Sequence, residues 1–387
     1  MVADTIAQKV KSMKTNEYIT SPYISNKTSH NEGGGNHIIS DQLMKMDYTV
    51  SHNYIDMLKN VMAGISYGEV VAMYGSELAN MAILYKHILH SEKMWEYSNI
   101  IQASIEINTM CNWKCRYCPN YKSPYKKQYM KASLFREVLR KLDSYGRIKD
   151  LSLNFYGEPL LDNRLSDKLE LILDTHMNLV LYTNGSLMDE KFFNAIKKFG
   201  NRATICINIP SLENEEFFEL TGYKHLDKVI GNVEHLLQSN IKVLISVNGE
   251  KNNRKNNINK IMERFPSISI KGSDTIDRAG AVKNEFFQNI SITEDKLFGC
   301  QAILHDLQID VEGNVIICCQ DFYKVHKLDN IQDFDSISDL LKSETIKKYR
   351  KKIYGAEEAP AEMICRKCIV MQENKSSSRF LLNKTYT

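Results

Sequence analysis

The chain has 387 residues, of which 43% are hydrophobic, enough for a substantial core and more than one domain. Its formal net charge is only +3, with 50 Lys and Arg against 47 Asp and Glu, so we expect no nucleic-acid partner. Nine cysteines, no signal-peptide core and no 18-residue apolar span predict a cytoplasmic protein with neither a disulfide framework nor a membrane partner.

The N-terminal quarter of the sequence divides into two parts. Residues 1–47 carry few large apolar side chains and contain Gly33-Gly34-Gly35, which predicts a disordered tail. Residues 48–99 have apolar positions at helical spacing, such as Ile55 and Leu58. We therefore expect a helical element of about fifty residues before a larger domain. No three-stranded sheet is evident ahead of these helices.

Between residues 100 and 280, apolar segments alternate with amphipathic ones across short loops, the pattern of βα units and a parallel sheet. The predicted strands lie near 101–108, 150–155, 178–183, 203–208, 242–248 and 267–272. The predicted helices lie near 131–145, 164–176, 189–199, 225–239 and 254–264. The sequence thus predicts six strands in an α/β domain.

Three cysteines follow the first of these strands, with spacings of four and three residues: Cys111, Cys115 and Cys118. Such a loop can give three thiolates to three irons of a cubane and leave the fourth iron without a protein ligand. A zinc ribbon would place two thiols on each of two knuckles, and a ferredoxin run would add a fourth cysteine nearby; neither continuation is present. An iron without a protein ligand can bind a substrate or cofactor and take part in a reaction.

This loop resembles the C-x3-C-x2-C signature of the radical SAM superfamily, including the aromatic Tyr117 before the last cysteine. After the second strand, Gly157-Glu158-Pro159 is similar to the family's G-G-E-P, with Tyr156 in place of its first glycine. The resemblance implies that Glu158 and the adjacent backbone receive the amino group of SAM. Thr183-Asn184-Gly185 is similar to the T-N-G turn after the family's third strand. Together these motifs imply a partial (β/α)6 TIM barrel with its site at the C-terminal strand ends.

Strand alternation over residues 203–210 puts Cys206 and Asn208 on one face, which we expect to look into the barrel. Related enzymes often carry Ser-x-Asp at these two places, with the serine near the SAM carboxylate. Cys206 is read either as a small buried hydrophobe or as a hydrogen-atom donor. Ser246 and Asn248 have the same geometry on the fifth strand and are expected to contribute to the SAM or substrate pocket.

Residues 281–387 carry a second set of cysteines. Four of them are candidate thiolate ligands that lie far apart in the sequence: Cys300, Cys318, Cys365 and Cys368. On spacing alone, four such thiolates could bind Zn²⁺ or a cubane cluster equally well. The run from Gly313 to Asp321, followed by a helix and C-x2-C, resembles the C-terminal region of twitch and SPASM radical SAM enzymes. That resemblance implies a small α+β domain with one auxiliary [4Fe–4S] cluster held by these four cysteines. Cys319 then either packs beneath the hairpin or donates a hydrogen atom to the substrate.

The resemblance implies an enzyme that reductively cleaves SAM and abstracts hydrogen from a substrate C–H bond, with two [4Fe–4S] clusters and a flavodoxin- or ferredoxin-type electron donor. We expect the substrate to be a ribosomally made precursor peptide, which is oxidised, crosslinked or epimerised, because residues 48–99 suggest a leader-peptide recognition element. The same segment is equally consistent with a helical extension that only packs on the barrel. A dehydrogenase or epimerase of a small sugar or aminocyclitol is the alternative, and a non-catalytic iron–sulfur or zinc scaffold is a third hypothesis.

Overall fold

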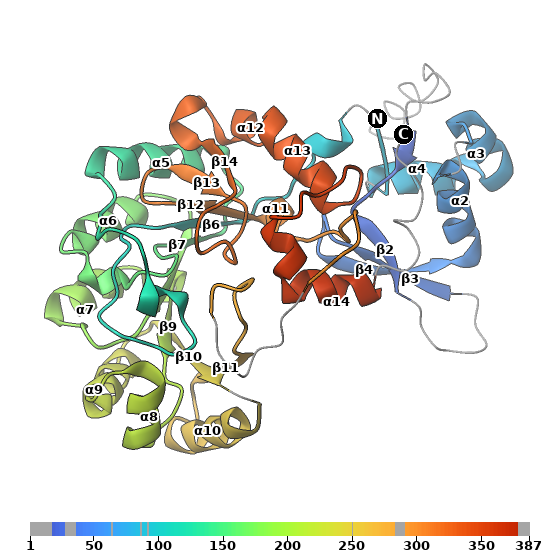
Figure 1. Cartoon of the computed structure of the whole chain (residues 1–387). Coiled ribbons are helices and arrows are strands. Elements are labelled where there is room, and N and C mark those ends of the chain that lie inside the picture. The colour runs from blue at the N-terminus through green and yellow to red at the C-terminus, as the bar shows by residue number, and fades with distance from the viewer. Residues whose placement is uncertain are drawn as a thin grey trace.

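The computed structural model describes residues 18–27, 36–62, 65–85, 87–90, 93–249, 251–282 and 291–377. Its centre is a nine-stranded sheet in the order β11-β10-β9-β8-β7-β6-β12-β13-β14 (Figure 1). Six neighbouring strands are parallel: β6 (Gln102–Ile105), β7 (Asp150–Ser152), β8 (Asn178–Thr183), β9 (Ala203–Asn208), β10 (Lys242–Gly249) and β11 (Ser269–Asp274). The partial six-stranded barrel is confirmed.

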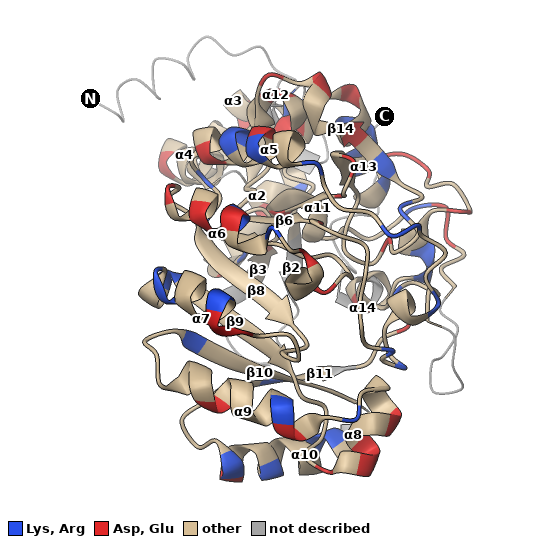
Figure 2. Ribbon diagram, turned by 90° about the vertical axis from the view of Figure 1, so that its left-hand side faces the viewer, with Lys and Arg blue, Asp and Glu red and all other residues tan. Residues whose placement is uncertain are grey.

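Helices connect these strands and cover the outer side of the curved sheet (Figure 1). They are α5 (Ala132–Tyr145), α6 (Leu165–Leu173), α7 (Glu190–Lys197), α8 (Asn214–Thr221), α9 (Leu226–Leu237) and α10 (Lys251–Arg264). Five of the six were predicted, and α8 was missed. Figure 2 shows Lys and Arg interleaved with Asp and Glu on helices such as α5 and α7.

Alternation along the strands separates the core from the barrel interior. On β9, Ile205 and Ile207 are fully buried on the helix-covered face. Thr204, Cys206 and Asn208 alternate with them and line the interior. The predicted orientation of Cys206 and Asn208 therefore agrees with the structure.

The C-terminal residues extend the barrel sheet. Strand β12 (Asp306–Ile309) pairs in parallel with β6, and β13 (Asn314–Ile316) and β14 (Lys327–Asn330) follow in antiparallel pairs. The helices of this region are α11 (Ala302–His305), α12 (Ile337–Leu340), α13 (Glu344–Ile353) and α14 (Ile369–Ser377). This small α+β region therefore shares one sheet with the barrel, which fixes its place beside β6.

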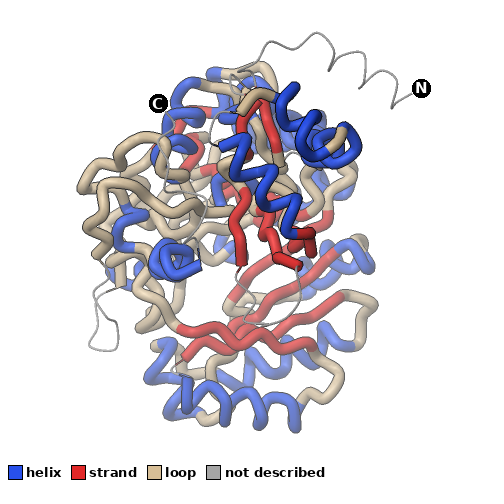
Figure 3. The backbone as a smooth tube through the Cα atoms, turned by 90° about the vertical axis from the view of Figure 1, so that its right-hand side faces the viewer, coloured by secondary structure: helices blue, strands red, loops and turns tan. Residues whose placement is uncertain are grey.

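The N-terminal residues contain strands as well as helices. Strand β1 (Tyr18–Thr20) pairs with β5 (Ile88–His90). A three-stranded antiparallel sheet follows: β2 (Ile24–Lys27), β3 (Asn36–Asp41) and β4 (Met46–Ser51). Helices α2 (His52–Met62), α3 (Tyr67–Tyr74) and α4 (Ser76–Leu84) come next, and Figure 3 shows these helices beside the strands. We call β2–β4 with α2–α4 the N-terminal unit.

The disordered tail predicted for residues 1–47 needs correction, since residues 18–27 and 36–47 lie in strands and turns. The rest of that range lies outside the described residues. The strands of this range bury few large apolar side chains, among them Ile24 and Ile39, so little in their sequence marks them as strands. Pairing and packing on α2 stabilise them, and a composition argument does not detect such contacts.

The N-terminal unit has its own apolar core and is also tied to the rest of the chain. Its core includes Ile39, Met57 and Leu58, and it is separate from the main core. The nearby residues Tyr23 and Trp95 belong instead to the main core, and the Tyr23 hydroxyl donates to the Met94 carbonyl at 2.7 Å. The Tyr23 ring also packs on Tyr354 at a centroid distance of 4.8 Å, so the segment before β2 anchors the unit to the C-terminal region.

Candidate active site

A cavity of about 760 Å³ occupies the barrel interior and opens at the C-terminal strand ends. All six parallel strands and the region after β13 contribute to its wall. The predicted site residues that line it are Cys111, Cys115, Tyr117, Cys118, Gly157, Glu158, Thr183, Asn184, Cys206, Asn208, Ser246 and Cys319. Pro159 and Gly185 belong to the same two turns but are not part of the wall. The structure thus gathers motifs that are up to about two hundred residues apart in sequence.

The first cysteine loop is hydrogen-bonded to the C-terminal end of α8, the helix that the sequence analysis did not predict. The amides of Lys114 and Arg116 donate to the carbonyls of Thr221 and Leu220 at 2.9 and 3.0 Å. Trp113 is buried, with its ring stacked on Tyr223 at a centroid distance of 5.2 Å. A tryptophan inside a polar loop was the available signal that this loop packs on another element.

The three thiols of the loop lie close enough to influence one another. Burial raises the pKa of Cys111 to about 12, and the nearby Glu158 carboxylate and Cys118 add to the rise. Burial also raises the pKa of Cys115, with further contributions from Cys118 and Cys111. Three neighbouring thiols with raised pKa values fit a cationic cluster, whose irons bind the thiolate form.

Glu158 is almost fully buried at the end of the second barrel strand. Its Oε1 accepts hydrogen bonds from the Thr183 hydroxyl at 2.7 Å and the Leu160 amide at 3.1 Å, and its Oε2 accepts from the Asn184 amide at 2.7 Å. Burial raises its pKa to about 7, although these hydrogen bonds oppose the rise. Oε2 retains acceptor capacity for one more donor, which fits the expected ammonium group of SAM.

Gly157 is required by the close approach of the cysteine loop. A Cβ atom at this position would lie 2.3 Å from the carbonyl oxygen of Asn108. The Glu158 amide donates to the Met110 carbonyl at 2.6 Å, and the Asn108 side-chain amide donates to the Glu158 carbonyl at 3.0 Å. The backbone at Gly157 and Glu158 is therefore locked against the segment that precedes Cys111.

The turn at Thr183-Asn184-Gly185 clamps the other side of the loop. The Asn184 side-chain amide donates to Asn112 Oδ1 at 2.8 Å and approaches Cys111 Sγ at 4.0 Å. Ser186 Oγ receives hydrogen bonds from the Asn112 amide at 3.0 Å and the Trp113 indole at 3.2 Å. Sequence reasoning found the turn but missed Asn112, Trp113 and Ser186.

A chain of side-chain hydrogen bonds crosses the strand ends beside Cys115. The Tyr117 hydroxyl donates to the Cys115 sulfur and accepts from the Asn208 amide at 2.7 Å. Asn208 Oδ1 in turn accepts from the Asn248 amide at 2.8 Å, and Asn248 lies within 3.4 Å of Ser246 Oγ. These polar groups, predicted as part of the SAM or substrate pocket, form one wall with fixed donors and acceptors.

The second cysteine set lies in the C-terminal region, outside the cavity wall. Burial raises the pKa of Cys300 to about 12, with a further contribution from Cys368. Burial likewise raises the pKa of Cys318, and the neighbouring thiols, Cys365 and Cys300 among them, raise it further. Among the described residues, no three His, Cys, Asp or Glu side chains meet tightly enough to hold a single metal ion. The four thiols are nevertheless near neighbours, and in a cubane each thiolate binds a different iron.

Cys206 on β9 and Cys319 after β13 both line the cavity. Cys206 is buried on β9, and burial raises its pKa to about 11. Cys319 is exposed on the cavity wall. Partial removal from water raises its pKa, the Arg278 charge lowers it and the Asp306 charge raises it. The interpretation that Cys319 packs beneath the hairpin therefore does not match its position.

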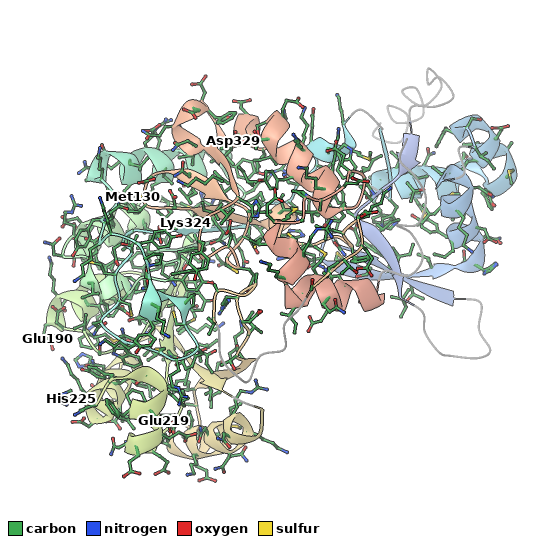
Figure 4. All side chains as sticks on the ribbon, in the orientation of Figure 1. Met130, Glu190, Glu219, His225, Lys324 and Asp329 are labelled. Atoms are coloured by element: carbon green, nitrogen blue, oxygen red, sulfur yellow. The ribbon has the colours of Figure 1, made fainter. Side chains whose placement is uncertain are left out.

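A buried ion pair fixes the loop after Cys319 to the barrel. The Lys324 ammonium pairs with the Glu106 carboxylate, which follows β6, and lies 5.0 Å from the centroid of the Tyr125 ring. Figure 4 labels Lys324 among the side chains of the barrel. The Tyr125 hydroxyl donates to the Phe322 carbonyl at 3.0 Å. The second thiol set consequently has a defined position relative to the first.

Family models match two parts of the chain. Residues 105–263 match the radical SAM superfamily, and residues 300–369 match SPASM, an iron-sulfur cluster-binding domain. The two matches cover the barrel with its first cysteine loop, and the region with the second cysteine set. In the described part of the chain, no helix is long and apolar enough to cross a membrane.

Curated relatives with similar sequences include one protein from Niallia circulans and one from Methanocaldococcus jannaschii. The S-adenosyl-L-methionine-dependent 2-deoxy-scyllo-inosamine dehydrogenase of Niallia circulans is 22% identical over 267 residues, which cover 68% of this chain and 90% of that protein. The uncharacterized protein MJ0804 of Methanocaldococcus jannaschii is 29% identical over 135 residues, or 34% of this chain. The match spans less than half of that archaeal protein, 42% of its length.

The fold is also similar to that of Streptococcus suis SuiB. The structure of SuiB bound to S-adenosylmethionine has a TM-score of 0.57 at 13% identity and covers 92% of this chain and 94% of SuiB. The structure of SuiB bound to its precursor peptide SuiA has a TM-score of 0.55 at 13% identity and covers 86% of this chain and 90% of SuiB. At this identity the likeness concerns the fold alone.

Proposed function

The chain belongs to the radical SAM superfamily and carries a SPASM-type iron–sulfur domain, and from this premise we propose that it modifies a ribosomally made precursor peptide. Membership implies SAM and [4Fe–4S] clusters as its cofactors. SAM bound at the open iron of a reduced cluster supplies a 5′-deoxyadenosyl radical, which takes hydrogen from a C–H bond. A flavodoxin- or ferredoxin-type protein is the proposed electron donor.

The proposed roles of the residues follow their positions. Cys111, Cys115 and Cys118 hold the cluster that binds SAM, and Glu158 accepts a hydrogen bond from the SAM ammonium. Tyr117, Asn208 and Ser246 belong to the wall against which SAM and substrate are oriented. The second cluster is held by Cys300, Cys318, Cys365 and Cys368.

The N-terminal unit is the observation that favours a peptide substrate. A three-stranded antiparallel sheet followed by three helices resembles the winged-helix elements that recognise leader peptides, and the sheet is the part that the sequence did not reveal. Within the described residues β4 pairs only with β3, so its outer edge is available to another strand. An extended peptide can bind there by adding main-chain hydrogen bonds.

An apolar patch flanks the open edge of β4. We define it by Met46, Tyr48, Met81, Leu84 and Tyr85. The Tyr48 and Tyr85 rings lie 5.5 Å apart, and this contact joins the strand to the end of α4. Within the strand, the Tyr48 hydroxyl is 3.7 Å from the Met46 sulfur. Met46 and Leu84 are 52% and 64% exposed. Exposed apolar side chains beside an open strand are suited to the alternate side chains of a bound peptide.

The fold of SuiB, which binds a precursor peptide, adds support of a general kind because its match includes most of this chain. An aminocyclitol substrate is the second proposal, and the match to the Niallia circulans dehydrogenase favours it. That match leaves about a third of this chain unaligned, and the peptide hypothesis gives a use to the N-terminal unit.

A binding and turnover experiment separates the two proposals. Anaerobically reconstituted enzyme is incubated with SAM, dithionite and either the short peptides encoded beside its gene or 2-deoxy-scyllo-inosamine. We expect a mass change in a peptide, with 5′-deoxyadenosine formed alongside. Oxidation of the aminocyclitol with every peptide unchanged would favour the second proposal.

Point variants test the apolar patch better than a truncation does. Deleting residues 1–99 would remove Tyr23 and Trp95 from the main core. Met46→Glu and Leu84→Glu should weaken peptide binding by about tenfold or more, because a carboxylate is placed beside apolar anchors. Met262→Glu on α10 is the matched control, since Met262 is 54% exposed and lies outside the patch. Equal affinities in all three variants would contradict the role of the N-terminal unit.

A further inference from the structure

The segment after β11 forms part of the cavity wall in an unusual backbone conformation. Three consecutive residues have positive φ, namely Arg278 at 52°, Ala279 at 52° and Gly280 at 84°. Glycine adopts this region freely, but for Arg278 and Ala279 it is sterically unfavourable. Such strain persists only where surrounding contacts impose it, and it is common at functional sites.

Hydrogen bonds to Asp277 hold this left-handed turn. Its Oδ2 accepts from the Gly280 amide at 3.1 Å, and its carbonyl accepts from the Val282 amide at 2.8 Å. The Ala281 amide donates to the Arg278 carbonyl at 3.1 Å. The turn is therefore closed by its own backbone and one side chain, and its consequence is that Arg278 lines the cavity.

The Arg278 guanidinium lies between the two cysteine regions. Its carbon atom is 5.9 Å from the centroid of the Tyr156 ring. Burial raises the pKa of Cys118, and a hydrogen bond from Asn120 and then the Arg278 charge lower it. Burial also raises the pKa of Cys319, and the Arg278 charge, the next largest effect, lowers it. The guanidinium therefore adjoins the SAM cluster loop on one side and Cys319 on the other.

The described part of the chain provides no ion pair or hydrogen bond for this guanidinium. Two other arginines have partners within the protein: Arg366 donates to several backbone carbonyls, and Arg264 pairs with Glu234. The buried carboxylate Glu158, on the same cavity wall, is already bound by Thr183 and Asn184. A half-buried guanidinium on a cavity wall, without an ionic partner among the described residues, is suited to bind an anion from outside.

We propose that Arg278 is a carboxylate-binding residue of the cavity, presented between the cluster loop and Cys319 by the left-handed turn at residues 278–280. The planar guanidinium matches a carboxylate with two parallel hydrogen bonds. The carboxylate belongs either to the methionyl part of SAM or to the substrate, as a peptide carboxyl group. The inference rests on the proposed function in taking this cavity as the site of SAM and substrate.

The test compares carboxylate ligands with neutral ligands of the same size. Reconstituted holoenzyme is titrated calorimetrically with SAM and with decarboxylated SAM. In a second arm, SAM-loaded holoenzyme is examined by saturation-transfer NMR with N-acetylglycine and with N-acetylglycinamide. The variants are Arg278→Gln and Arg278→Lys, with Arg147→Gln as control. Arg147 also lies 5.9 Å from a tyrosine ring, that of Tyr145, but outside the cavity.

We expect Arg278→Gln to lose about ten- to a hundredfold in affinity for the carboxylate ligand of one arm, and nothing for its neutral match. Arg278→Lys should lose less because it keeps the charge, and Arg147→Gln should match the wild type. A loss in the first arm assigns the site to SAM, and a loss in the second assigns it to the substrate.

Two results would overturn the inference. One is unchanged affinity for both SAM and N-acetylglycine in Arg278→Gln. The other is an equal loss for carboxylate and neutral ligands in both Arg278 variants, which would indicate a distorted cavity. Failure of the wild-type holoenzyme to bind SAM would contradict the proposed function instead, and the N-acetylglycine comparison, repeated on holoenzyme without SAM, would still decide the inference.

Discussion

The hydroxyl of Tyr156 donates a 2.6 Å hydrogen bond to the backbone carbonyl of Cys319, 163 residues further along the chain. Burial raises the pKa of Tyr156, the Arg278 guanidinium opposes the rise, and Cys319, Cys118 and Cys318 add to it. The phenol thus lies near thiols of both cysteine sets. It occupies the position where the family motif has a glycine, so this bridge is specific to a chain with a large side chain there.

Replacing Tyr156 with Phe should loosen the loop that carries Cys318 and Cys319. The variant keeps the ring, which packs at 5.0 Å from Phe322, but loses the hydrogen bond, at a cost of about 1 kcal/mol of unfolding free energy. Hydrogen exchange should become faster at the amides of residues 318–322. The control Tyr129→Phe removes a hydroxyl that bonds the Leu161 carbonyl at 3.3 Å on the surface. Unchanged protection of residues 318–322 in Tyr156→Phe would show that the bridge has no mechanical role.

The sequence predicted those parts of the site that depend on short motifs. Cys111, Cys115 and Cys118 lie within eight residues, and Gly157-Glu158-Pro159 needs only its strand end to be located. Hydrogen-bond partners that only the tertiary fold brings together could not be predicted from the sequence. Asn112 and Ser186 bond across 74 residues, and nothing in either local sequence indicates the other.

The parts of the fold that were missed share a physical reason. Strands β2–β4 are largely polar, so their stability depends on pairing and on the buried face of α2. The conformation of Arg278 was equally hidden, because a positive φ at a residue other than glycine is imposed by its surroundings.

Replacing Cys111, Cys115 and Cys118 together with Ala should halve the iron content. Wild-type protein reconstituted without oxygen should hold about eight irons and eight sulfides as two cubanes, and the triple variant about four. SAM cleavage should be lost entirely, because the open iron is lost. Iron analysis and electron paramagnetic resonance of the reduced protein provide the measurement. Zinc without iron at the remaining four cysteines, in protein purified without oxygen, would contradict the second cluster.

The affinity for SAM should depend on pH through Glu158. Its pKa is raised to about 7, so the carboxylate is largely protonated at pH 6 and ionised at pH 8. The SAM ammonium favours the ionised form, so binding releases a proton below pH 7. Affinity should therefore rise about fivefold from pH 6 to pH 7, and it should fall above about pH 8, where the SAM amino group loses its proton. Calorimetric titrations of the holoenzyme at several pH values measure this slope.

The variant Glu158→Gln should bind SAM about ten- to a hundredfold more weakly at pH 8, with no such slope and with both clusters intact. The amide can still accept hydrogen bonds from Thr183 and Asn184, so the turn should keep its shape. A variant that retains both wild-type affinity and the wild-type slope would show that another group receives the ammonium.

The last prediction concerns Cys319 as a hydrogen-atom donor. Its thiol faces the cavity beside Arg278 and Asp306, next to the proposed cluster ligand Cys318, and Cys206 faces the same cavity from β9. If the enzyme is an epimerase, a thiol returns a hydrogen atom to the substrate radical, and the resulting sulfur radical takes up one electron and one proton before the next turnover. In D2O the product would then gain one deuterium, because the thiol exchanges with solvent. Cys319→Ala should stop product formation while 5′-deoxyadenosine still forms, and Cys206→Ala should remain active. Product without solvent deuterium, or full activity in both variants, would exclude epimerisation and leave the second cluster as the oxidant of the substrate radical.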